Sequence, residues 1–118
     1  MTNRSATSST RVLATLAALA LAAAPFGAGV ATAAATKTVT LKNIAFSPKS
    51  LKVSRGTKVT FVFRDGTTIH NVTSTGRTRF QTIGSRSSGS QSRTFHRAGT
   101  YRYECTLHPG MTGRIVVH

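Results

Sequence analysis

Four side chains in this sequence offer the donor types of a copper site. Cys105, His108 and Met111 follow one another at intervals of three residues, and His70 lies far upstream. Thiolate and thioether sulfurs are soft ligands that favour Cu(I), whereas imidazole nitrogen suits both oxidation states. A trigonal plane of one cysteine and two histidines with a weak axial methionine is the ligand set of blue-copper electron-transfer sites. The residue types and their order therefore predict one copper site that gains and loses an electron with little rearrangement.

Each of these residues alone has a simpler interpretation. A lone cysteine at a strand end is most often a small buried apolar side chain, and a lone methionine usually packs in a core. The order of the residues, the Pro109-Gly110 turn and the remote His70-Asn71 pair together favour metal binding. The two remaining histidines, His96 and His118, are interpreted as an ordinary strand residue and a solvated C-terminal residue.

The elements that must position these ligands are expected to be short β-strands. From residue 37 onwards apolar and polar residues alternate with the period of a half-buried strand, and no stretch has a helical period. Because alternate side chains of a strand share a face, Tyr101, Tyr103 and Cys105 should point into the core together. Such strands, separated by Gly, Pro, Asp and Ser, predict a two-sheet sandwich or a small barrel. The expected strands are 38–42, 50–54, 58–64, 69–74, 92–96, 100–105 and 113–118, with a break at 46–49 and an irregular loop at 75–91.

Residues 1–35 have the pattern of a secretory signal peptide that is removed. Arg4 and Arg11 precede an apolar run of 13 residues, 12–24, and small residues with A-x-A-like cleavage sites follow. The run is shorter than the roughly 18–20 residues that span a bilayer, which argues against an uncleaved anchor. We therefore expect an exported protein that resides outside the cell, in the cell envelope or in the periplasm, with one mature domain at 36–118.

Composition excludes several classes of protein. The single cysteine cannot form an internal disulfide, and it is too few for Cys₄ zinc or iron–sulfur sites. The chain has 16 Lys and Arg but 2 acidic residues, a formal net charge of +14. This excess is expected to give a solubilising surface that also attracts an acidic redox partner, an anionic membrane or a cell-envelope polymer. No nucleic-acid motif is present, so nucleic acid is not an expected partner.

Two stretches resemble the cupredoxin family, which includes plastocyanin, pseudoazurin and amicyanin. One is AGTYRYECTLHPGMTGRIVV at residues 98–117; the other runs from Phe46-Ser47-Pro48 through Leu51-x-Val53-x-x-Gly56-x-x-Val59-x-Phe61 to His70-Asn71-Val72. The two-residue gap between His108 and Met111 is most similar to amicyanin. The resemblance implies an all-β Greek-key sandwich of about seven or eight strands in two sheets. It also implies that His70, Cys105, His108 and Met111 bind copper, and that the Asn71 amide bridges to the ligand loop near Thr106.

The function expected from these features is that of a monomeric carrier of single electrons between larger redox proteins. His108 should reach the surface within a small apolar patch, where a partner gains a close route to the metal. The alternative is a protein that stores, delivers or detoxifies copper without carrying electrons. An enzyme is not expected, because copper oxidases and nitrite reductases need further copper centres, and His96 and His118 are the only spare histidines.

Overall fold

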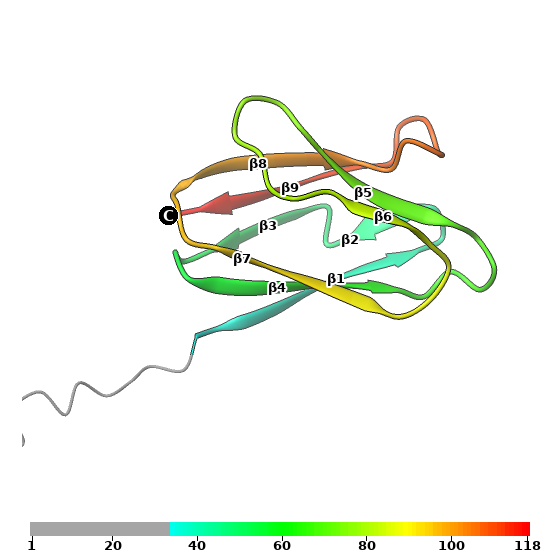
Figure 1. Ribbon diagram of the computed structural model, residues 1–118, viewed down its shortest axis with the longest axis horizontal. Coiled ribbons are helices and arrows are strands. Elements are labelled where there is room, and N and C mark those ends of the chain that lie inside the picture. Colours follow the sequence, from blue (N-terminus) through cyan, green and yellow to red (C-terminus); the bar gives the residue numbers. More distant parts are fainter. Residues whose placement is uncertain (1–33) are drawn as a thin grey trace, which may run out of the picture. The chain divides into compact units, whose positions relative to one another are not determined.

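The computed structural model describes residues 34–118, so residues 1–33 of the expected signal peptide lie outside the described residues. Nine strands follow one another along the described part (Figure 1). Helices are absent from residues 34–118, so no helix there could cross a membrane. The strands are β1 (Thr36–Lys42), β2 (Ala45–Ser47), β3 (Ser50–Val53), β4 (Thr57–Phe63), β5 (His70–Thr75), β6 (Ile83–Arg86), β7 (Ser90–Phe95), β8 (Gly99–Glu104) and β9 (Thr112–Val117).

The strands form two sheets that pack face to face (Figure 1). One sheet has the order β2-β1-β4-β7 and the other the order β3-β9-β8-β5-β6. Strands β1 and β4 pair in parallel, as do β3 and β9, and every other pair is antiparallel. The arrangement confirms the all-β sandwich, rather than the small barrel, among the architectures that the alternating pattern allowed.

The core lies between the sheets and is built from the alternate residues of each strand. Val59, Phe61 and Phe63 of β4 are buried, as the period of two predicts. The predicted inward row on β8 is also present, since Tyr101, Tyr103 and Cys105 are all buried. This row directs the cysteine sulfur into the interior at the point where β8 ends.

Two strands depart from the sequence prediction. Strand β2 extends into the expected break at 46–49, and β6 with the start of β7 occupies part of the expected loop 75–91. Each of the two short strands buries one large apolar side chain, Phe46 in β2 and Ile83 in β6. A single apolar residue shows no alternation, so these strands exist through pairing with β1 and β5 and not through their own pattern. The strand count is therefore nine and not seven or eight.

Candidate metal centre

The pairing of two strands brings His70 and Cys105 to the same end of the sandwich. Strand β5 begins at His70, β8 ends one residue before Cys105, and the antiparallel register sets Thr73 opposite Glu104. The Nδ1 atom of His70 consequently lies 3.7 Å from Sγ of Cys105, although 35 residues separate them. Both side chains are almost completely buried, with exposed fractions of 0% and 2%. Sheet register therefore assembles the first half of the predicted site.

A tight loop between β8 and β9 brings the other two predicted ligands back to the cysteine. The backbone N–H of Cys105 donates to the Met111 carbonyl at 2.9 Å, and that of Met111 donates to the His108 carbonyl at 3.0 Å. Gly110 turns the chain with a φ of 83°, a conformation that favours glycine. The loop closes on itself, so Met111 is buried while His108 stays partly exposed.

The donor atoms of His70, Cys105 and His108 all lie within 4.8 Å of one another. The centroids of the two imidazole rings are also 4.8 Å apart. Two imidazole nitrogens and a thiolate are a suitable set for copper, and a thioether in the same loop completes the four donor types. In the described residues, three of the predicted ligands therefore lie together, and the fourth, Met111, belongs to the same loop as Cys105 and His108.

Hydrogen bonds on the far nitrogens of the two histidines leave their other nitrogens available to a metal. Nε2 of His70 donates to Oδ2 of Asp65 at 2.7 Å, and Nε2 of His108 donates to the Ile69 carbonyl at 3.1 Å. With the proton on Nε2 in a neutral ring, the lone pair is on Nδ1. In His70 this is the atom that faces the cysteine sulfur. A carboxylate on the far nitrogen is a common way to fix the tautomer of a metal-binding histidine.

Asp65 is held in its ionised form by the groups around it. Its Oδ2 accepts a hydrogen bond from the backbone N–H of Ile44 at 3.0 Å as well as that from His70. The Ile44 N–H is the main cause that lowers the pKa of this carboxyl from its ordinary value of 3.8, and the His70 bond is the second. A negative charge therefore lies one imidazole ring away from the candidate metal position.

Asn71 ties the start of β5 to the ligand loop. Its Nδ2 donates to Oγ1 of Thr106 at 2.7 Å, and its Oδ1 accepts from the Thr106 backbone N–H at 3.0 Å. The same Oδ1 also accepts from Oγ1 of Thr73 at 2.9 Å. These bonds join the residue after His70 to the residue after Cys105, so the positions of the two loops are coupled.

Exposed large apolar side chains of the described residues gather at this end of the sandwich. Ile44 contacts Asp65 through its backbone, Ile69 precedes His70, and Leu107 precedes His108. Their exposed fractions are 53%, 51% and 49%. We call Ile44, Ile69 and Leu107 the apolar patch; it adjoins the partly exposed His108.

Sequence reasoning did not single out Asp65 or Ile44 as parts of the site. Asp65 lies between two expected strands, 58–64 and 69–74, and Ile44 follows the end of another. One signal was available, because a rare acidic residue in a basic chain stands five positions before a predicted ligand. The contact with Ile44, 21 residues away, depends on tertiary structure.

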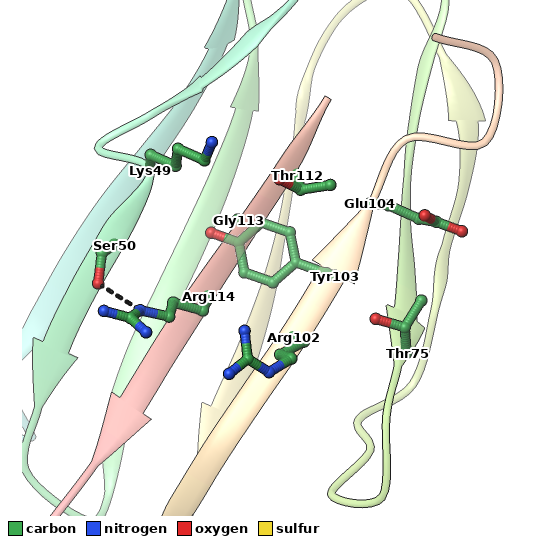
Figure 2. Close-up of a pocket in the computed structure, with 9 residues that line it drawn as sticks. All are labelled: Lys49, Ser50, Thr75, Arg102, Tyr103, Glu104, Thr112, Gly113 and Arg114. Atoms are coloured by element: carbon green, nitrogen blue, oxygen red, sulfur yellow. Dashed lines mark hydrogen bonds between the residues drawn. The ribbon is translucent and has the colours of Figure 1, made fainter. Parts of the chain in front are cut away.

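A groove of about 440 Å³ on the five-stranded sheet is separate from the site (Figure 2). It is lined from β3, β5, β8 and β9, and Nε of Arg114 donates across it to Oγ of Ser50 at 3.0 Å. The buried Tyr103 ring lies against Gly113 beneath it, and burial raises the pKa of the tyrosine hydroxyl. None of the predicted copper ligands lines this groove.

Comparisons with known proteins identify the family and the fold. A family model described as a cupredoxin-like domain matches residues 11–117. A reduced amicyanin variant is 31% identical with a TM-score of 0.61, and the match covers 70% of this chain and 82% of that one. A purple cupredoxin from Nitrosopumilus maritimus has the same fold at 22% identity and a TM-score of 0.63, with 70% and 99% covered.

One similar structure belongs to an enzyme, a copper-containing nitrite reductase from Thermus scotoductus SA-01. It is 28% identical with a TM-score of 0.64, and the match covers 70% of this chain but 22% of the reductase chain. No curated protein matches the chain.

Family and cofactor agree with the sequence prediction. The family model extends over most of the chain, and the arrangement of His70, Cys105, His108 and Met111 is consistent with a type 1 copper site. On these findings the chain belongs to the cupredoxin-like family, whose fold and copper site the sequence predicted.

Proposed function

We propose that this cupredoxin is an exported blue copper protein that carries single electrons between larger redox proteins. The observation that carries the proposal is the convergence of the His70, Cys105 and His108 donor atoms within 4.8 Å, beside an exposed apolar patch. A buried thiolate and two oriented imidazoles form a site that suits copper in both oxidation states. The family itself contains both carriers and enzyme domains, so the carrier role is inferred from this chain's own residues.

Each residue of the predicted ligand set has a distinct part in the proposed site. Cys105 supplies the thiolate from the end of β8, and His70 and His108 supply Nδ1 atoms whose tautomer is set by Asp65 and the Ile69 carbonyl. Met111 would supply a thioether as a weak fourth donor. Copper bound there would supply the one-electron Cu(II)/Cu(I) couple, while the hydrogen bonds keep the ligands in one geometry for both states.

The patch around His108 is the proposed contact surface for the redox partner. His108 is partly exposed while His70 is fully buried, so His108 offers a partner the shortest route to the metal. A small apolar area surrounded by charge suits brief encounters, which need fast association and a small interface. The formal charge is +14 for the full chain and +14 − 2 = +12 without Arg4 and Arg11 of residues 1–35, which indicates a partner with an acidic docking surface.

Export is proposed from the pattern of residues 1–35, with the mature cupredoxin domain at 36–118. The pattern also favours the periplasm, the cell envelope or the extracellular space as the place where the protein acts. The proposal includes a monomer without enzymatic activity of its own. The reductase neighbour shows that the same fold also occurs within enzymes, so the fold does not support the absence of enzymatic activity. That absence is inferred because the sequence has too few spare histidines for a further copper centre.

Electron self-exchange, measured by NMR line broadening in mixtures of Cu(I) and Cu(II) protein, tests the carrier role. We expect rapid exchange in the wild type and a slower rate in Ile69→Ser/Leu107→Ser, with the reduction potential unchanged. A matched control is Val62→Ser/Val116→Ser, which alters partly buried strand residues outside the patch. The alternative role in storage or delivery predicts slow exchange together with rapid loss of Cu(I) to a soluble chelator, and that outcome would overturn the proposal.

A further inference from the structure

Three arginines converge on one recess of about 330 Å³ that the copper site does not use. Arg77 and Arg79 belong to the loop after β5, and Arg97 belongs to the turn before β8. Thr78, Ala98 and Tyr101 complete the lining. We call this the arginine recess. A second recess of about 310 Å³ shares Arg79, Arg97 and Tyr101 with it and adds Arg93 and His96.

The loop and the turn that supply these arginines pack closely against each other. A Cβ atom added to Gly99 would lie 3.2 Å from Cγ2 of Thr78, so the glycine permits the close approach. The hydroxyl of Tyr101, a residue with 5% exposure, donates to the Arg97 carbonyl at 2.8 Å. On the other side Nη1 of Arg79 donates to the Ser74 carbonyl at 3.1 Å. The recess is therefore bounded by fixed backbone on both sides.

The positive charges of the recess have no acidic partner in the protein. The sequence has two acidic side chains, of which Asp65 is bonded to His70 and Glu104 lines the separate groove of Figure 2. Within residues 34–118 neither carboxylate is paired with an arginine or a lysine. Neighbouring like charges repel, so an anion that entered the recess would relieve the repulsion and gain hydrogen bonds at once.

The chemistry of the recess selects a phosphate-type oxyanion. Guanidinium groups offer forked donors whose geometry matches the oxygens of phosphate, and the Thr78 hydroxyl adds a further polar group. The volume is at the lower end of the usual range for small-molecule sites, roughly 300–1,000 Å³. The exposed large apolar residues of the described part are all at the copper end, so a soluble or polymer-borne phosphate fits better than insertion into a membrane.

We propose that the arginine recess binds a phosphate-bearing anion, independently of copper. The recess is at the opposite end of β8 from Cys105, which over six residues of strand is a separation of about 20 Å. Figure 1 shows the loop after β5 and the turn before β8 on the side away from the 105–111 loop. Anion binding would therefore leave the apolar patch free, and the protein could be retained on a phosphate-rich polymer while its copper end meets a redox partner.

Titration calorimetry with inorganic pyrophosphate on the copper-loaded protein is the test. We expect saturable binding with one site per chain, and a loss of affinity of about tenfold or more in Arg77→Gln/Arg97→Gln. The Arg77→Lys/Arg97→Lys variant keeps the charge but loses the forked guanidinium donors. Its affinity should therefore lie between that of the wild type and that of the glutamine variant. The control Lys42→Gln/Lys52→Gln removes two exposed charges elsewhere and should change affinity less than about twofold.

Thermal melting separates a folding defect from a binding defect. Pyrophosphate should raise the melting temperature of the wild type and of the control but not that of Arg77→Gln/Arg97→Gln, whose melting temperature without the anion should not fall. Cys105→Ser should bind pyrophosphate as the wild type does, so failure of the copper site would leave this result intact. Three results would overturn the proposal. The control and recess variants could lose equal affinity for pyrophosphate, or the binding could be non-saturable. The protein could also bind phosphatidylglycerol vesicles without binding pyrophosphate.

Discussion

The carboxylate of Asp65 accepts a hydrogen bond from Nε2 of His70 at 2.7 Å, on the side of the ring away from the Cys105 sulfur. The same carboxylate oxygen accepts from the Ile44 backbone at 3.0 Å. Asp65 therefore links the turn between β1 and β2 to the most deeply buried of the predicted ligands. Through His70 it sets which ring nitrogen would be available to a metal, and it places a negative charge one imidazole ring away from that position.

Replacing Asp65 by Asn should weaken Cu(II) binding and raise the reduction potential. Loss of such a partner typically costs metal affinity about 10–100-fold. The potential should rise because a nearby negative charge stabilises Cu(II) more than Cu(I). Chelator competition and voltammetry measure the two quantities. The control is Glu104→Gln, which also removes one negative charge; Glu104 is next to Cys105 but its side chain has no hydrogen bond to a predicted ligand. Equal changes in copper affinity and reduction potential in the two variants would contradict the role given to Asp65.

The stability of the metal-free protein should decrease in acid through Asp65. Its pKa lies below the ordinary 3.8 in the folded protein, chiefly because of the Ile44 N–H and then His70. A carboxyl whose folded pKa is lowered stabilises the fold above its unfolded pKa, and this stabilisation is lost as pH falls through the folded value. Urea unfolding between about pH 3 and about pH 6 should show a steeper acid decline for the wild type than for Asp65→Asn. Parallel curves would count against this assignment.

The turn residue Ile44 is expected to lower stability in exchange for an exposed apolar contact. Asn43 and Ile44 have φ values of 54° and 52° between paired strands, a conformation that is unfavourable for a β-branched residue. Ile44→Asn should raise the free energy of unfolding by about 1 kcal/mol while slowing electron self-exchange. Ile69→Asn should slow exchange without the gain in stability. A destabilised Ile44→Asn variant would show that the turn is not strained.

Gly113 should tolerate no side chain, because Tyr103 fills the space beside it. A Cβ at Gly113 would lie 2.5 Å from Cε2 of Tyr103, whose ring is packed edge-on against Phe46 and Phe61. Gly113→Ala should therefore lower the free energy of unfolding by about 1–3 kcal/mol. The control is Gly84→Ala, where no atom lies within 4 Å of an added Cβ. Urea denaturation of the two variants makes the comparison, and similar losses would refute the steric explanation.

The sequence predicted the strands in which apolar and polar residues alternate strictly. It did not predict the short strands that have a single buried apolar residue. The alternation of Val59, Phe61 and Phe63 predicted β4 and its buried face. Strands β2 and β6 were missed, because Phe46 and Ile83 are each the single buried apolar anchor of a short strand. Their existence depends on backbone hydrogen bonds to neighbouring strands, and no local pattern records those bonds.

The candidate site was predictable to the extent that its chemistry is local in sequence. The spacing of Cys105, His108 and Met111 predicted one loop, and the structure has that loop. The carboxylate behind His70 and the exposed turn residue Ile44 depend on sheet packing, so the sequence alone did not reveal them. The copper-binding roles of the four side chains remain predictions that the convergence of their donors supports.

The most direct test is the visible absorption and EPR spectrum of the Cu(II)-loaded protein, compared with those of Cys105→Ser. The account predicts an intense thiolate-to-Cu(II) band and a narrow copper hyperfine splitting in the wild type, both lost in Cys105→Ser. His96→Asn, a change at an exposed histidine outside the site, should leave both unchanged. A wild-type protein that binds Cu(II) without the visible band, or a Cys105→Ser variant that keeps it, would contradict the account.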